Sequence, residues 1–139
     1  MPCMQPGKVI DRMVDLIRAN FDVDAIYLYG SRAKGRERPD SDWDLAVLFS
    51  VFEADIYERV LRPQRVEEVL QRELFMYDQV SVVDLEMAPP ALQMNIIMGR
   101  RVYDRLVPHV RRVEYSIISK IEKDYVYIAQ IFSKIQGVL

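Results

Sequence analysis

Asp42 and Asp44, in the segment "YGSRAKGRERPDSDWDL" (residues 29–45), are the first residues whose types and spacing could do chemistry. Residues two apart on a strand point the same way, so the two carboxylates would lie side by side. Their repulsion raises a carboxylate's pKa and costs free energy unless cations neutralise it. Mg²⁺ suits this role, because it takes hard oxygen ligands from one or two carboxylates and from nucleotide phosphates. The pair either extends into water or holds a metal, and we expect a metal.

Gly30 and Ser31 precede this pair and could bind the phosphates. Gly30 lets the backbone come close to a phosphate, while Ser31 offers a hydroxyl and, with its neighbours, backbone N–H groups. Arg32 can donate two hydrogen bonds to phosphate oxygens. A triphosphate site opposite a metal site indicates phosphoryl or nucleotidyl transfer, in which proteins mainly position groups and neutralise charge. A solvated charged loop is the alternative.

Asp84, in "VSVVDLE", is the strongest candidate for the third carboxylate that a two-metal site usually needs. An aspartate inside an apolar strand has a desolvation cost that something must offset. We expect it to lie beside Asp42 and Asp44, to bind the metal that activates the acceptor hydroxyl, and to accept its proton. A structural cap or an ion pair is the alternative. His109 has no metal-ligand spacing to another histidine or cysteine and receives no role.

Hydrophobic patterns place these residues on a small mixed sheet flanked by helices. The predicted elements are a helix over 8–20, strands over 25–31 and 44–52, a helix with Pro63 in its first turn, a strand over 79–86, a helix over 89–99 and a strand over 100–104. Residues 52–61 would form a separate turn or a loop. This order predicts an α/β (α+β) domain over residues 1–104, with residues 105–139 as its helical extension.

The C-terminal helix carries a continuous apolar stripe. Its members recur at alternating spacings of three and four: Ile118, Ile121, Tyr125, Ile128, Phe132, Ile135 and Leu139. Such a stripe usually covers the domain's own core. The alternative is a helix that binds a partner or a second copy.

Composition sets limits on the function. A chain of 139 residues, half of them hydrophobic, can build one compact domain with a core. The net charge of −2 argues against a surface that grips nucleic acid directly. Cys3 is the one cysteine, which suits a reducing cytoplasm. No segment approaches the roughly 18 apolar residues of a membrane span, so we expect a cytoplasmic protein without a membrane partner.

The arrangement "G-S, ten residues, D-x-D", between two strands and followed by an aspartate on a third, resembles the polymerase-β-type nucleotidyltransferase superfamily. Residues 24–104 are similar to the minimal nucleotidyltransferases, the MNT-domain antitoxins that pair with HEPN-domain ribonuclease toxins. The resemblance implies a polymerase-β-like fold. It also implies that Gly30 and Ser31 bind the phosphates of ATP and that Asp42, Asp44 and Asp84 hold two Mg²⁺ ions.

The implied activity is transfer of AMP from ATP to a tyrosine of the HEPN toxin, which silences its RNA cleavage. Antitoxin and toxin would form a hetero-oligomer. Two alternatives stay open. The chain could transfer nucleotide to a small molecule such as an aminoglycoside, or it could be a catalytically silent antitoxin that neutralises its toxin by binding.

Overall fold

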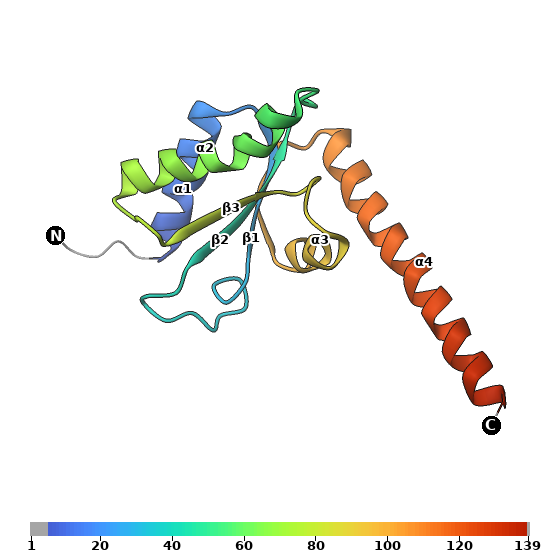
Figure 1. Ribbon diagram of the computed structural model, residues 1–139. Coiled ribbons are helices and arrows are strands. Elements are labelled where there is room, and N and C mark those ends of the chain that lie inside the picture. The colour runs from blue at the N-terminus through green and yellow to red at the C-terminus, as the bar shows by residue number, and fades with distance from the viewer. Residues whose placement is uncertain (1–5, 139) are drawn as a thin grey trace.

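The computed structural model describes residues 6–138, and the side chains within that range except those of Pro6, Ile128, Ile131, Phe132 and residues 135–138. Cys3 and Leu139 lie outside it. The elements shown in Figure 1 are α1 (Pro6–Asn20), β1 (Val23–Tyr29), β2 (Trp43–Phe49), α2 (Ile56–Leu74), β3 (Val80–Asp84), α3 (Pro90–Ile97), β4 (Arg100–Asp104) and α4 (Pro108–Val138). The predicted α+β class, with a small mixed sheet, is confirmed.

The four strands form one sheet in the order β3-β2-β1-β4. β1 is antiparallel to both β2 and β4, whereas β2 and β3 run parallel. The end of β1 and the starts of the other three strands therefore lie at the same end of the sheet. One row of residues crosses this end: Tyr29 pairs with Asp44, and Asp44 pairs with Ser81.

Helices cover both faces of the sheet. α1 and α2 pack on one face and α3 and α4 on the other, as Figure 1 shows. Side chains alternate along β2, so Leu45 and Val47 contact the α1–α2 core while Ala46 and Leu48 contact the α3–α4 core. β2 is buried on both faces, as its continuous apolar sequence predicts. By the same alternation, Asp44 belongs to the α3–α4 face.

The helix α2 begins earlier than predicted. Its N-cap is Asp55, whose Oδ1 accepts hydrogen bonds from the N–H groups of Tyr57 (2.9 Å) and Glu58 (3.3 Å). Pro63 therefore lies inside the helix, and the prediction that it begins the helix is wrong. The carboxylate cap satisfies the first free N–H groups, and the helix loses a single backbone hydrogen bond at the proline.

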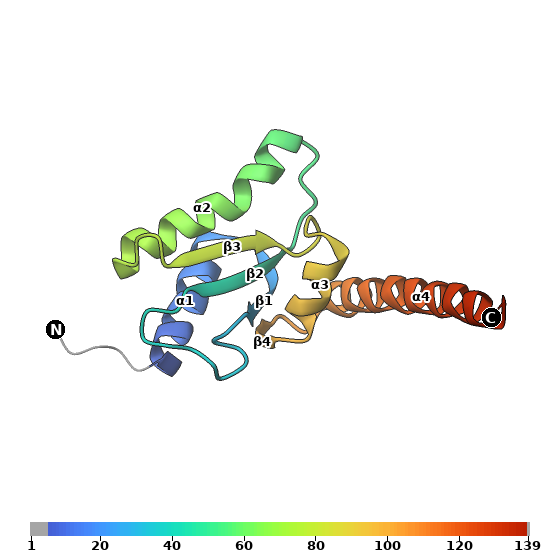
Figure 2. The same cartoon turned by 60° about the horizontal axis from the view of Figure 1, so that its bottom comes forward.

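The first half of α4 packs on the domain, whereas the described side chains of its second half do not. Val110 and Ile117 are 1% and 3% exposed, and Ile121 also contacts the α3–α4 core. Beyond Ile121 every described side chain of α4 is exposed, and Tyr125 is 73% exposed. Figures 1 and 2 both show this part of the helix extending away from the sheet. Of the predicted stripe, Ile121 contacts the core, Ile118 is half-buried and Tyr125 is exposed, whereas the buried Val110 and Ile117 are not members of it.

Within residues 6–138 the structure contains no helix that is both long and apolar enough to cross a membrane.

Candidate functional site

The turn after β1 brings Gly30 against the carboxylate of Asp44. The two lie close because Tyr29, the last residue of β1, pairs with Asp44. Gly30 has a φ of 75°, and a Cβ atom added to it would lie 3.2 Å from Asp44 Cγ and closer still to Oδ2. The left-handed backbone and the missing Cβ are therefore both required here. The two halves of the motif, predicted from their spacing, meet at this contact.

Asp42 and Asp44 provide the negative charge of the site. Asp44 is half-buried and Asp42 is exposed. Burial raises the pKa of Asp44, and the charge of Asp42 raises it further. The phenol of Tyr29 also has a raised pKa, because of burial first and then of the charges of Asp44 and Glu67. A cation bound between the two carboxylates would relieve their repulsion.

Ser31 begins a closed turn beside this pair. Its carbonyl accepts hydrogen bonds from the N–H groups of Lys34 (3.2 Å) and Arg36 (3.0 Å). The N–H groups at the start of such a turn precede its first hydrogen bond and can bind an anion. The half-buried Ser31 hydroxyl lies at the same point of the chain. This geometry matches the predicted phosphate-binding role of Gly30 and Ser31, which stays a prediction.

Arg32 braces the loop rather than facing Asp44. Its guanidinium donates hydrogen bonds from Nη2 (2.8 Å) and Nε (3.1 Å) to the carbonyl of Ser41, and it stacks on the Trp43 ring at 4.0 Å from the centroid. Trp43 packs in the α1–α2 core, on the opposite face of the sheet from Asp44. The structure therefore does not bring Arg32 to the proposed phosphate site, and we assign it to holding the loop closed.

Asp84 also lies away from the acid pair, which corrects the expectation that it completes the metal site. It pairs with Val47, whose side chain faces α1 and α2, and its Oδ2 lies 3.6 Å from Nη2 of Arg62 on α2. Its Oδ1 accepts a hydrogen bond from the N–H of Glu86 (3.0 Å). Burial raises the pKa of Asp84, although these contacts oppose the rise. The placement matches the structural alternative, a cap with an ion pair.

The physical reason is the register of the strands. The residue of β3 that pairs with Asp44 is Ser81, three positions before Asp84. Side chains alternate along a strand, so an odd separation turns Asp84 to the other face. Ser81 could not be identified from the sequence, because only the pairing of β3 with β2 shows which residue of β3 lies next to Asp44. The residues that the structure describes contain no group of three His, Cys, Asp or Glu side chains placed to hold a metal ion.

The described residues therefore fit one Mg²⁺ ion better than two. Asp42 and Asp44 offer two carboxylates on one face, which is the usual protein share of a magnesium site that a nucleotide completes. A second ion would add charge that no third carboxylate in this row balances.

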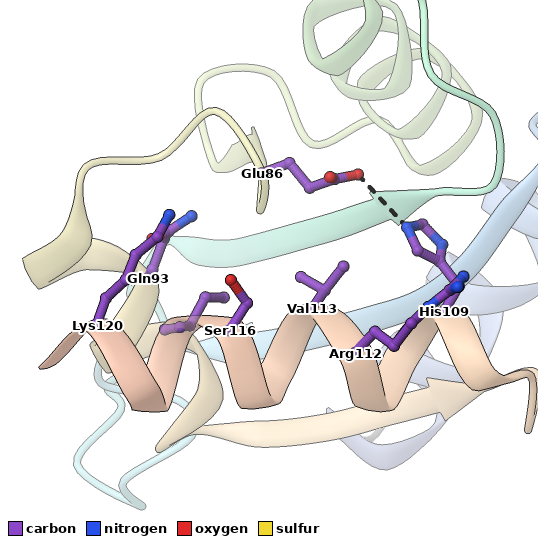
Figure 3. Close-up of a pocket in the computed structure, with 8 residues that line it drawn as sticks. Glu86, Gln93, His109, Arg112, Val113, Ser116 and Lys120 are labelled. Carbon is purple, nitrogen blue, oxygen red and sulfur yellow. Dashed lines mark ion pairs between the residues drawn. The ribbon is translucent and has the colours of Figure 1, made fainter. Parts of the chain in front are cut away.

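A second polar cluster lies at the opposite end of the sheet. The buried Asp24 accepts a hydrogen bond from the Ser50 hydroxyl (2.6 Å) and lies 2.8 Å from Nδ1 of His109. Nε2 of His109 lies 3.7 Å from Oε1 of Glu86. Both residues line a pocket of about 260 Å³, which Figure 3 shows. These contacts link the start of α4 to β1, so His109, which sequence analysis left without a role, has a structural one.

Comparisons with known proteins agree with this fold. A family model described as "Polymerase beta, Nucleotidyltransferase" matches residues 12–106. No curated protein sequence matches the chain.

Solved structures of toxin–antitoxin complexes contain chains with the same fold. A toxin–antitoxin complex with AMP-PNP contains a chain with 22% identity and a TM-score of 0.66, covering 91% of this chain and 97% of that one. The structure of a tri-AMPylated Shewanella oneidensis HEPN toxin in complex with MNT antitoxin contains a chain with 19% identity and a TM-score of 0.65, covering 95% of this chain and 99% of that one. An MntA–HepT toxin–antitoxin structure contains a chain with 20% identity and a TM-score of 0.63, covering 94% of this chain and 98% of that one.

Proposed function

Because the chain belongs to the polymerase β nucleotidyltransferase family, we propose that it is an antitoxin that transfers AMP from ATP, with Mg²⁺, to a tyrosine of a HEPN ribonuclease toxin. The contact between Gly30 and the carboxylate of Asp44 carries the proposal, because it holds the turn proposed to bind phosphate directly against an acid pair. The similar structures support it, since one complex holds AMP-PNP and another an AMPylated toxin. The chain would act in the cytoplasm, where ATP and RNA both occur.

The proposed reaction breaks a phosphoanhydride bond of ATP and forms a phosphate ester bond to the toxin. The tyrosine oxygen of the toxin bonds to the α-phosphorus of ATP, the bond from that phosphorus to the bridging oxygen breaks, pyrophosphate leaves and the phenol proton passes to water. Mg²⁺, when bound, would neutralise the charge of the phosphates. Gly30 and Ser31 would bind the triphosphate, and Asp42 and Asp44 would hold the cation against it. The chain thus contributes position and charge, as phosphoryl-transfer proteins generally do.

The distal half of α4 offers a surface for the toxin. Tyr125, Val126 and Tyr127 are 73%, 52% and 64% exposed, and the helix extends away from the domain (Figure 2). Exposed aromatic side chains are typical anchors of protein interfaces. We therefore propose that the hetero-oligomer forms through this part of α4.

One observation favours a second candidate, an antitoxin that neutralises by contact alone. Asp84 lies on the opposite face of the sheet, so the acid pair lacks the third carboxylate expected of a two-metal transferase. In that case α4 would supply the whole neutralising effect.

A labelling experiment separates the two candidates. The chain would be incubated with Mg²⁺, α-labelled ATP and the HEPN toxin encoded beside it, and label would be followed on the toxin. Transfer predicts label with the wild-type chain and none with the Asp42→Asn/Asp44→Asn variant. The same variants would be expressed with the toxin in cells. Protection of cells by the Asp42→Asn/Asp44→Asn variant, which does not label the toxin, would favour neutralisation by contact. The absence of label with the wild-type chain would refute transfer to the toxin.

A further inference from the structure

We propose that this site binds one divalent cation per nucleotide, because Ser81 occupies the position at which a second cation would need a carboxylate. The inference rests on the proposed function, because it assumes that nucleotide binds at Gly30, Ser31 and the acid pair. It extends that function by assigning the number of cations and the position that sets it.

One row of paired residues lies at the end of the sheet that carries the acid pair. Tyr29, Asp44 and Ser81 are direct neighbours on β1, β2 and β3. Neighbouring strands lie about 4.8 Å apart, and paired residues point to the same face. Ser81 is half-buried and thus partly open to solvent at this point. A ligand for a second cation, which in two-metal sites lies about 3.5–4 Å from the first, would have to come from this position of β3.

A serine hydroxyl cannot replace a carboxylate in this position. It is neutral at physiological pH, so it adds an oxygen but no negative charge. Two Mg²⁺ ions that close together repel strongly, and a carboxylate shared between them is what offsets the repulsion. With only Asp42 and Asp44 present, the nucleotide phosphates would have to offset the rest of the repulsion between the two ions.

Among the described residues, Asp84 and Glu67 are other carboxylates near β3, and each already contacts another part of the protein. Asp84 faces α2 and pairs with Arg62. Glu67 also belongs to α2, and its Oε1 accepts a hydrogen bond from the N–H of Val82 (2.8 Å). This bond holds the Glu67 carboxylate in contact with the β3 backbone, one residue beyond Ser81. Glu67 is therefore the competing ligand that an experiment must exclude.

The prediction is tested by counting bound Mn²⁺ on the full-length chain. Mn²⁺ would be titrated in the presence of an ATP analogue that carries a methylene group between the α- and β-phosphates, from which AMP cannot be transferred. Free Mn²⁺ would be measured by electron paramagnetic resonance. The wild-type chain should bind one Mn²⁺ per bound nucleotide. Ser81→Asp should bind two, with the second at least about tenfold tighter than any second ion on the wild type. The uncharged control, Ser81→Asn, should stay at one.

The wild-type count decides the matter even where a variant fails to fold, which thermal unfolding would reveal. Two Mn²⁺ ions per nucleotide on the wild-type chain would overturn the inference while leaving the proposed function intact. A fall from two to one in Glu67→Gln would then identify Glu67 as the ligand. A folded Ser81→Asp variant that stays at one would also overturn it. Failure of the wild-type chain to bind the analogue at all would instead refute the proposed function, and the inference with it.

Discussion

Replacing Gly30 by alanine should disable the site, and the chain provides a matched control for the cost to the backbone. Gly30 and Gly35 both have positive φ angles, 75° and 68°. Alanine in this conformation costs about 1–2 kcal/mol at either position. The difference is in the surroundings. A Cβ at Gly35 meets nothing within 4 Å, whereas at Gly30 it collides with the Asp44 carboxylate. Gly30→Ala must therefore also displace Asp44 or the turn.

Both variants should lose about 1–2 kcal/mol of unfolding free energy, measured by urea denaturation, and Gly30→Ala somewhat more. Only Gly30→Ala should lose affinity for Mg²⁺ and nucleotide, by about 10- to 10²-fold in a fluorescence titration, because a lost hydrogen bond to a charged group costs about 1.5–3 kcal/mol. Wild-type affinity in both variants would refute the claim that the contact between Gly30 and Asp44 builds the site. Equal loss in both would show that the whole loop, rather than this contact, sets the affinity.

Three further predictions separate the site from the structural residues. Asp84→Asn should lower the free energy of unfolding by about 1–3 kcal/mol, since it removes the charge facing Arg62, yet leave nucleotide affinity unchanged in the same titration. Burial alone would raise the pKa of Asp24, but its hydrogen bonds and the cations beside it outweigh burial and lower it. The stability that Asp24 contributes is therefore complete above its ordinary pKa of 3.8 and is lost as pH falls further. The free energy of unfolding measured against pH should show this loss in the wild type but not in Asp24→Asn. Ile117→Ala should cost about 2–4 kcal/mol in urea denaturation, whereas Tyr125→Ala should cost under ~0.5 kcal/mol and weaken toxin binding measured by calorimetry.

The sequence predicts the local parts of the site well. The ten-residue spacing between Ser31 and Asp42, with a strand on each side, is enough to predict that the turn and the acid pair meet, because an antiparallel strand pair returns the chain to the same end of the sheet. The buried strand β2 is equally readable from its apolar run, although that run continues to Phe52 and the strand ends at Phe49. Both features depend on residues close together in the chain.

Features that depend on the register of distant segments are predicted poorly. Whether Asp84 or Ser81 faces Asp44 depends on how β3 pairs with β2, and a shift of one residue reverses the face. Arg32 finds its partners, Ser41 and Trp43, only when the loop has closed. The start of α2 is a different case, because Asp55 is a readable N-cap that outweighs the signal of a proline.

Transfer of label from α-labelled ATP to the HEPN toxin, compared between Asp44→Asn, Asp40→Asn and Asp84→Asn, tests the central claim most directly. Asp40 is exposed in the same loop, so Asp40→Asn controls for the loss of one charge there. The account predicts that Asp44→Asn lowers the rate at least ~10²-fold, while Asp40→Asn and Asp84→Asn transfer at the wild-type rate once stability is matched. A fall of the same size in Asp84→Asn, or wild-type transfer by Asp44→Asn, would contradict it.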